Sequence, residues 1–228
     1  MKSTLQIFCV LILVILFSFS AKAQFKELGI GVGAFNYTGD LVRGYDFSFN
    51  RPAVHIFYRR NTRDHVSFRY EIAGGQLAGN DDDPIDALAI ERNASFDIFI
   101  LEGSASFEYN FLDFRKEGAV VDFTPYFTGG IGVMRMFDVG ERNGDFDLTQ
   151  PFIPFGVGIK RAFSNNINVD FRFTARKVFT DYLDNVSGGD VRFKDFNFGN
   201  DNDSDWYYHV GISISYVFYT LPCPFPYF

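Results

Sequence analysis

Apolar and polar residues alternate along several stretches of this chain. In the clearest stretch, residues 167–176, the Ile, Val, Phe and Ala side chains share one face, and the Asn, Asp, Arg and Thr side chains share the other. The same period-two alternation covers residues 66–73, 99–111 and 208–218. Because successive side chains of a β-strand point to opposite faces, each stretch predicts a strand with one apolar and one polar face.

Four weaker patterns predict further strands. In residues 28–34 and 153–159, apolar residues alternate mostly with Gly, which fits the crowded inside of a small barrel. Residues 53–59 and 124–137 predict strands that are apolar on parts of both faces. Long polar connections alternate with shorter ones, as in an outer-membrane barrel. The long ones are residues 37–50, 76–95, 138–150 and 180–205, and the shorter ones are residues 60–65, 112–122 and 162–166.

The sequence therefore predicts an all-β fold, an eight-stranded antiparallel transmembrane β-barrel of the small OmpA/OmpW-like type. An ion that faced lipid near the bilayer midplane would cost about 2–4 kcal/mol, so charges on the polar faces must point into the lumen. Eight strands enclose only enough room for side chains, so we expect a plug of paired charges rather than an aqueous pore. The predicted lumen charges, four of each sign, are Arg69, Lys160, Arg172 and Arg176 with Glu71, Glu102, Glu108 and Asp170.

The first 23 residues have the pattern of a cleaved signal peptide. Lys2 precedes an apolar run from Leu5 to Phe19, and Ala21 and Ala23 are the small residues that a signal peptidase reads. The run is shorter than the roughly 20 residues of a membrane-spanning helix, so cleavage after Ala23 is favoured over an uncleaved anchor. We expect a signal peptide over residues 1–23, an outer-membrane barrel over 24–218 and a Pro-rich periplasmic tail over 219–228, with both termini in the periplasm.

Composition narrows the classes of partner. Of the 228 residues, 30 are Phe and 12 are Tyr, more aromatic rings than a water-soluble core of this size needs. Such numbers favour contact with outer-membrane lipid. The formal net charge of -7 repels phosphate backbones, so nucleic acid is not expected as a partner.

No motif in the chain predicts a catalytic or cofactor site. The glycines of residues 29–33 do not open a helix, as a phosphate loop would. The aspartates of residues 201–205 begin like a calcium loop, but Trp206 stands where that loop needs Gly. His55 and His209 lie in predicted strands without a nucleophile elbow, and a bond from each to a lumen carboxylate is the simpler interpretation. We expect no cofactor, no metal and no enzymatic activity.

Several segments are similar to a known family. They are ELGIGVGAFNYTGDL at residues 27–41, Arg51-Pro52, Phe57-Tyr58-Arg59, residues 124–132 and FTDYLDNVSG at residues 179–188. Together they resemble the PorG family, small outer-membrane barrels of the type IX secretion system of Bacteroidota. The resemblance implies a non-enzymatic subunit that associates with the periplasmic ring of PorK and PorN and ties it to the outer membrane. The alternative is a free-standing OmpA/OmpW-like barrel that strengthens the envelope, binds a ligand at its loops or passes small apolar solutes.

A ring contact would have to come from the periplasmic end of the barrel. Basic residues cluster in or next to two of the short connections there, and they are Arg59, Arg60, Arg63, Lys160 and Arg161. These cations are candidates for the partner contact, and binding to lipid headgroups is an equally good interpretation.

The last predicted strand also fits the signal that outer-membrane folding machinery reads, which ends in an outward aromatic residue. The predicted signal comprises His209, Gly211, Ile214, Tyr216 and Phe218.

Overall fold

The computed structural model describes residues 25–38, 45, 47–62, 65–80, 95–114, 121–137, 148–179 and 206–219. The expected signal peptide, Arg63, most of the long connections and the tail beyond Tyr219 lie outside these ranges. The described residues contain no helix that is long and apolar enough to cross a membrane. Their elements are β1 (Phe25–Thr38), η1 (Phe47–Phe49), β2 (Arg51–Asn61), β3 (Val66–Asn80), β4 (Ser95–Asn110), β5 (Phe123–Phe137), β6 (Thr149–Ala162), β7 (Ile167–Val178) and β8 (Trp206–Tyr219).

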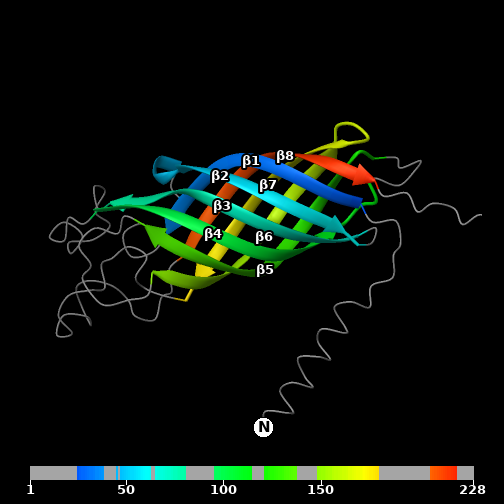
Figure 1. Ribbon diagram of the computed structural model, residues 1–228. Helices are drawn as coiled ribbons and strands as arrows, with labels where there is room; N and C mark the ends of the chain where they lie inside the picture. The colour runs from blue at the N-terminus through cyan, green and yellow to red at the C-terminus, as the bar shows by residue number, and fades with distance from the viewer. Residues whose placement is uncertain are drawn as a thin grey trace, which may run out of the picture.

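The eight strands form a closed antiparallel barrel in sequence order (Figure 1). Closure is made by β1 and β8, which pair along their whole length from Phe25 with Tyr219 to Thr38 with Trp206. Closing the sheet leaves no unpaired edge strand, which an open sheet would expose. The predicted eight-stranded antiparallel barrel is confirmed, and β8 ends one residue beyond the expected boundary at Phe218.

The two ends of the barrel differ in their connections. We call the end where β1 begins and β8 ends the turn end, and the opposite end the loop end. At the turn end, the Thr62 amide donates to the Val66 carbonyl between β2 and β3, and the Phe163 amide donates to the Ile167 carbonyl between β6 and β7, each at 2.9 Å. Residues 111–122 join β4 to β5 at the same end.

Strands β3 and β4 extend further toward the loop end than their patterns predicted. The expected connection over residues 76–95 is shortened to residues 81–94, because Gln76 to Asn80 pair with Ser95 to Phe99. The inward residues of this extension are apolar, and Leu77 and Ile98 are buried. The outward residues here include Gln76 and Asp97, so the extension reverses the contrast of polar inside and apolar outside on which the strand prediction depended.

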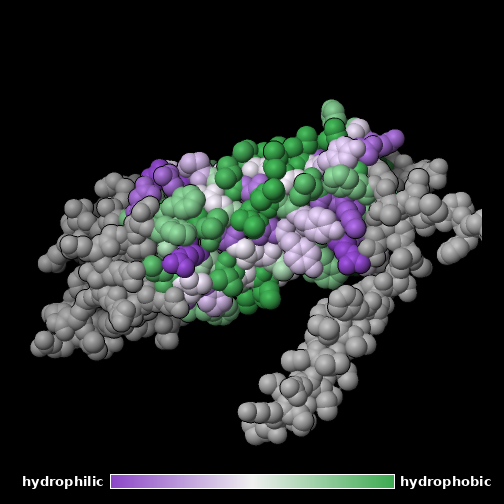
Figure 2. All heavy atoms as spheres, viewed as in Figure 1, coloured by the Kyte–Doolittle hydropathy of each residue, from purple (hydrophilic) through white to green (hydrophobic). Residues whose placement is uncertain are grey.

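The outer surface of the barrel is apolar around its middle (Figure 2). Ile30, Val32 and Ile131 are each more than half exposed. Aromatic rings meet in pairs towards the strand ends, including Tyr216 with Phe218 at the turn end and Phe99 with Phe137 at the loop end. An exposed aliphatic band between aromatic girdles fits a lipid bilayer rather than water, so the outward face is the lipid-facing surface.

Candidate functional site

All eight charges that the sequence assigned to the lumen are buried inside the barrel. Each of these residues is at most 5% exposed. Their inward direction follows from strand parity, since their neighbours in sequence form the lipid-facing surface. Two further buried ions join them, Glu27 on β1 and Arg59 on β2. These ten buried ions, five cations and five carboxylates, form what we call the lumen ion network.

Arg59 lies at the centre of the turn-end half of this network. Its guanidinium contacts three carboxylates, with N···O distances of 2.8 Å to Glu27, 2.8 Å to Glu108 and 2.5 Å to Asp170. The residue is fully buried, so it cannot reach a periplasmic partner. The assignment of Arg59 to a partner contact is therefore wrong. Arg59 instead links β1, β2, β4 and β7 across the lumen.

Lys160 was also assigned to a partner contact, and that assignment is wrong for the same reason. Its ammonium lies 2.6 Å from a Glu108 carboxylate oxygen and donates to the side-chain carbonyl of Asn110 at 2.8 Å. It also lies 4.1 Å from the ring centre of Tyr126. The buried ammonium thus has an ion partner, a neutral acceptor and an aromatic face, which together compensate its loss of water.

A second branch of the network centres on Glu71. Arg69 lies 2.6 Å from one Glu71 oxygen, and Arg172 lies 2.5 Å from the other. Arg69 also reaches Asp170 at 3.0 Å, so this branch is connected to the Arg59 branch. The guanidinium of Arg69 stacks 3.5 Å above the ring centre of Phe57. Each ion in this branch therefore has more than one compensating contact.

The network ends towards the loop end at Glu102. Arg176 lies 2.6 Å from one Glu102 oxygen, and the Tyr207 hydroxyl donates to the other at 2.7 Å. Tyr207 also contacts the ring of Phe35 edge-on. The polar half of the lumen thereby continues directly into an apolar half.

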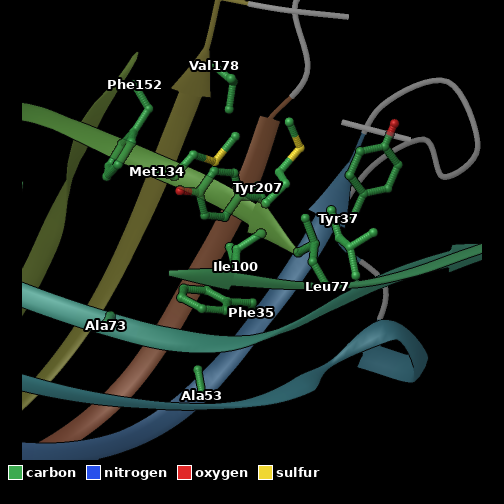
Figure 3. Packing of buried hydrophobic residues seen from close by; sticks show 12 residues of the cluster. Phe35, Tyr37, Ala53, Ala73, Leu77, Ile100, Met134, Phe152, Val178 and Tyr207 are labelled. Carbon is green, nitrogen blue, oxygen red and sulfur yellow. The ribbon is translucent and has the colours of Figure 1, made fainter. Parts of the chain in front are cut away.

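Buried apolar side chains fill the loop-end half of the lumen (Figure 3). Figure 3 shows them converging from different strands into one cluster. The cluster comprises Phe35, Tyr37, Ala53, Ala73, Leu77, Ile98, Ile100, Met134, Met136, Phe152, Val178 and Tyr207. Sequence reasoning missed this cluster, because it assumed polar inward faces throughout. Ions and apolar side chains together seal the described part of the lumen.

The sequence predicted that each lumen histidine bonds to a carboxylate. Among the described residues, the structure shows no such bond for either of them. The rings of His55 and His209 meet nearly perpendicular to each other, with centroids 5.1 Å apart. Neither ring nitrogen of His209 has a hydrogen-bond partner within the described ranges. Gly31, Gly33 and Gly211 surround the pair, and a Cβ at any of these positions would collide with a histidine ring or the neighbouring backbone. The glycines therefore make room for the imidazoles. No set of three His, Cys, Asp or Glu side chains among the described residues could hold a metal ion.

Two of the predicted turn-end cations do face outward. Arg161 is exposed and pairs with the exposed Asp122 at 2.9 Å, while Arg60 is half-buried at the end of β2. Lys26, opposite Arg60 in the β1–β2 register, is a third outward cation at this level. The described turn end therefore has a basic rim, although Arg59 and Lys160 do not belong to it.

The five residues of the predicted assembly signal all lie on β8. Ile214, Tyr216 and Phe218 face outward, and each is about half exposed, whereas His209 and Gly211 face the lumen. The Tyr216 and Phe218 rings contact each other with centroids 4.9 Å apart. An outward aromatic pair thus marks the end of the closing strand.

No curated protein matches this chain. Among solved structures, it is similar to Ail, the attachment invasion locus protein of Yersinia pestis, in complex with the heparin analogue sucrose octasulfate, at 11% identity and a TM-score of 0.47 over 87% of this chain and 100% of that one. It is similar to Neisserial surface protein A at 11% identity and a TM-score of 0.47, over 86% and 97% of the two chains. It is similar to the N-terminal β-barrel domain of Pseudomonas aeruginosa OprF at 13% identity and a TM-score of 0.45, over 86% and 100%.

A family model matches residues 5–227 of the chain. Its description is "Domain of unknown function (DUF6089)". Because the match spans nearly the whole sequence, the chain belongs to the DUF6089 family.

Proposed function

We propose that this protein is an outer-membrane barrel subunit of a type IX protein secretion machine, which associates with the periplasmic ring of PorK- and PorN-like proteins and ties it to the outer membrane. The sealed lumen is the observation that carries this proposal. The inside of the barrel is filled by a neutral ion network and an apolar cluster, so the barrel is poorly suited to conduct solutes. Its function is therefore expected at its two ends and on its lipid-facing surface. The segments that resemble the PorG family support the choice of this machine.

In this proposal the turn end and both chain termini face the periplasm. Short turns on the periplasmic side are typical of outer-membrane barrels. The outward cations Lys26, Arg60 and Arg161 lie at this end, where they would meet either headgroups of the inner leaflet or an acidic partner surface.

The proposed role is non-enzymatic. A histidine that acts as a general base needs a hydroxyl, thiol or water within hydrogen-bond reach. The ring contacts of His55 and His209 are with each other and with Phe57 and Phe35. Both imidazoles thus pack against aromatic rings within the described lumen.

The sealed lumen predicts that the purified protein does not conduct ions. In planar bilayers at neutral pH we expect no discrete channel openings, because passage would require breaking the contacts of Arg59 and displacing the cluster around Phe35 at the same time. A porin inserted under the same conditions provides the positive control. Reproducible openings in samples free of porin would contradict the sealed lumen and favour the free-standing barrel that passes solutes.

Charge reversal at the turn end tests the partner contact. We expect the triple variant Arg60→Glu, Arg63→Glu and Arg161→Glu to lose co-purification of the ring proteins after gentle detergent extraction from the native membrane. Arg135→Glu is the matched control, since Arg135 is an exposed outward cation at the loop end of β5. Heat-dependent migration on a gel checks that each variant is folded. Ring proteins retained at wild-type yield in the triple variant would reject this contact and leave lipid binding as the role of these cations.

A further inference from the structure

The lipid-facing surface is hollowed along β6. An apolar groove of about 360 Å³ is lined there mainly by outward side chains of β5, β6 and β7, together with Phe111 just beyond β4. Val157 pairs with Phe127 on one side and Phe173 on the other, so a short aliphatic side chain lies between two long aromatic ones. Ile159, the next outward residue of β6, lies between Pro125 and Phe171. The aromatic rings form the walls of the groove, and β6 forms its floor.

The turn end of this groove carries a cation. Arg161 is the next outward residue of β6 after Ile159, and its side chain is 67% exposed. The Arg161 Nε donates to an Asp122 carboxylate oxygen at 2.9 Å. That bond uses one of the five N–H donors of a guanidinium, so the remaining four can bind an anion. Arg161 does not line the groove, but it follows the groove floor at the turn end as a guanidinium that can bind an anion.

We propose that the groove binds one acyl chain of a membrane phospholipid, with the lipid phosphate held by Arg161. The occupant must be apolar along its length, because the walls are Phe, Val, Ile and Pro side chains. It must also come from the bilayer, because the groove opens onto the lipid-facing surface. A guanidinium binds phosphate through paired hydrogen bonds, and a phospholipid joins a phosphate to acyl chains.

The position of Arg161 fits this geometry. It follows the apolar floor at the level where β6 approaches its last residue, Ala162. A cation there meets the headgroup layer, while Val157 lies two outward positions deeper, roughly 13 Å along the strand from Arg161. The site requires only that the barrel is embedded in a bilayer, so it does not depend on the proposed secretion role.

Native mass spectrometry of the whole protein tests the site. The protein is reconstituted with phosphatidylglycerol and extracted in mild detergent, and the bound phosphatidylglycerol is counted. We expect one retained lipid in the wild type. Val157→Phe fills the groove and should lower retention by about tenfold or more, since burial of even two methylene groups contributes about that factor. Arg161→Gln should lower retention a few-fold.

Two matched variants separate a specific site from general lipid coating. Val54→Phe makes the same substitution at an exposed outward position of β2, and Arg135→Gln removes an outward cation at the loop end. Both should retain the lipid at wild-type level. Equal retention in Val157→Phe and wild type would overturn the groove, and equal loss in Val157→Phe and Val54→Phe would show unspecific coating only. Loss in Val157→Phe with full retention in Arg161→Gln would overturn the phosphate contact. A bound protein in place of lipid would overturn the proposal as a whole.

Discussion

Replacing Arg59 by alanine is expected to lower the free energy of unfolding of the barrel by about 3–5 kcal/mol, the cost of breaking a buried ion pair. Glu27, Glu108 and Asp170 would each lose a cation that lies within 2.8 Å. The remaining network would carry an excess negative charge among buried side chains. Unfolding by urea in lipid vesicles measures the change, and the chain's single tryptophan, Trp206, reports it by fluorescence.

Arg161→Ala provides the comparison for this variant. It removes the same side chain from an ion pair of similar length, 2.9 Å, but both partners are mostly exposed. An exposed pair contributes roughly 0–1 kcal/mol, so this variant should unfold nearly as the wild type does. If the two alanine variants lose equal stability, burial of the lumen ion network does not determine its contribution.

Gly130→Ala is expected to destabilise the barrel by about 1–3 kcal/mol, as overpacking does. A Cβ at this position would lie against the carbonyl oxygen of Ala105 and the Cα of Ser106, both in the backbone of β4. Backbone atoms cannot rotate out of the way as a side chain can, so β4 and β5 would have to separate locally. The midpoint and slope of urea unfolding measure the effect.

The adjacent glycine supplies the control. Gly129 faces outward, and an added Cβ there meets nothing within 4 Å. Gly129→Ala should be neutral or should stabilise the barrel by up to about 1 kcal/mol, because alanine has fewer conformations to lose on folding. Destabilisation of the same size in both variants would mean that the glycine pair serves the strand backbone rather than the packing between strands.

The sequence was sufficient to predict the strands, their facing and most of the buried ions. On β7, strict alternation separates Asp170 and Arg172 from Phe171, and the lumen-facing residues follow directly from it. The physical basis is strong, because a charge on the wrong face would meet lipid. The argument works wherever one face is ionic and the other is apolar.

Strand alternation does not identify the inward residues where the two faces of a strand differ little in polarity. Arg59 ends the strand predicted over residues 53–59, which has apolar residues on both faces, so the face of Arg59 was not assigned, although His55 shares it. The register places Glu27 opposite Arg59, and two opposite charges on paired strands could have indicated the bond. The contact between Arg59 and Asp170 crosses the lumen, and no local pattern encodes such a contact. The apolar cluster was missed for a related reason, since Leu77 and Ile98 face inward yet resemble lipid-facing residues.

The lumen ion network links membrane insertion to the formation of the last strand pair. Its ten ions come from β1, β2, β3, β4, β6 and β7. Arg59 on β2 can contact Asp170 on β7 only when the sheet has closed into a barrel. A half-built sheet in hydrocarbon would present unpaired ions to lipid, where each is costly. Strands therefore cannot enter the bilayer one hairpin at a time, and insertion becomes a late, concerted event. The same barrier acts in reverse, so the closed cylinder resists being unzipped from either side of its β1–β8 seam.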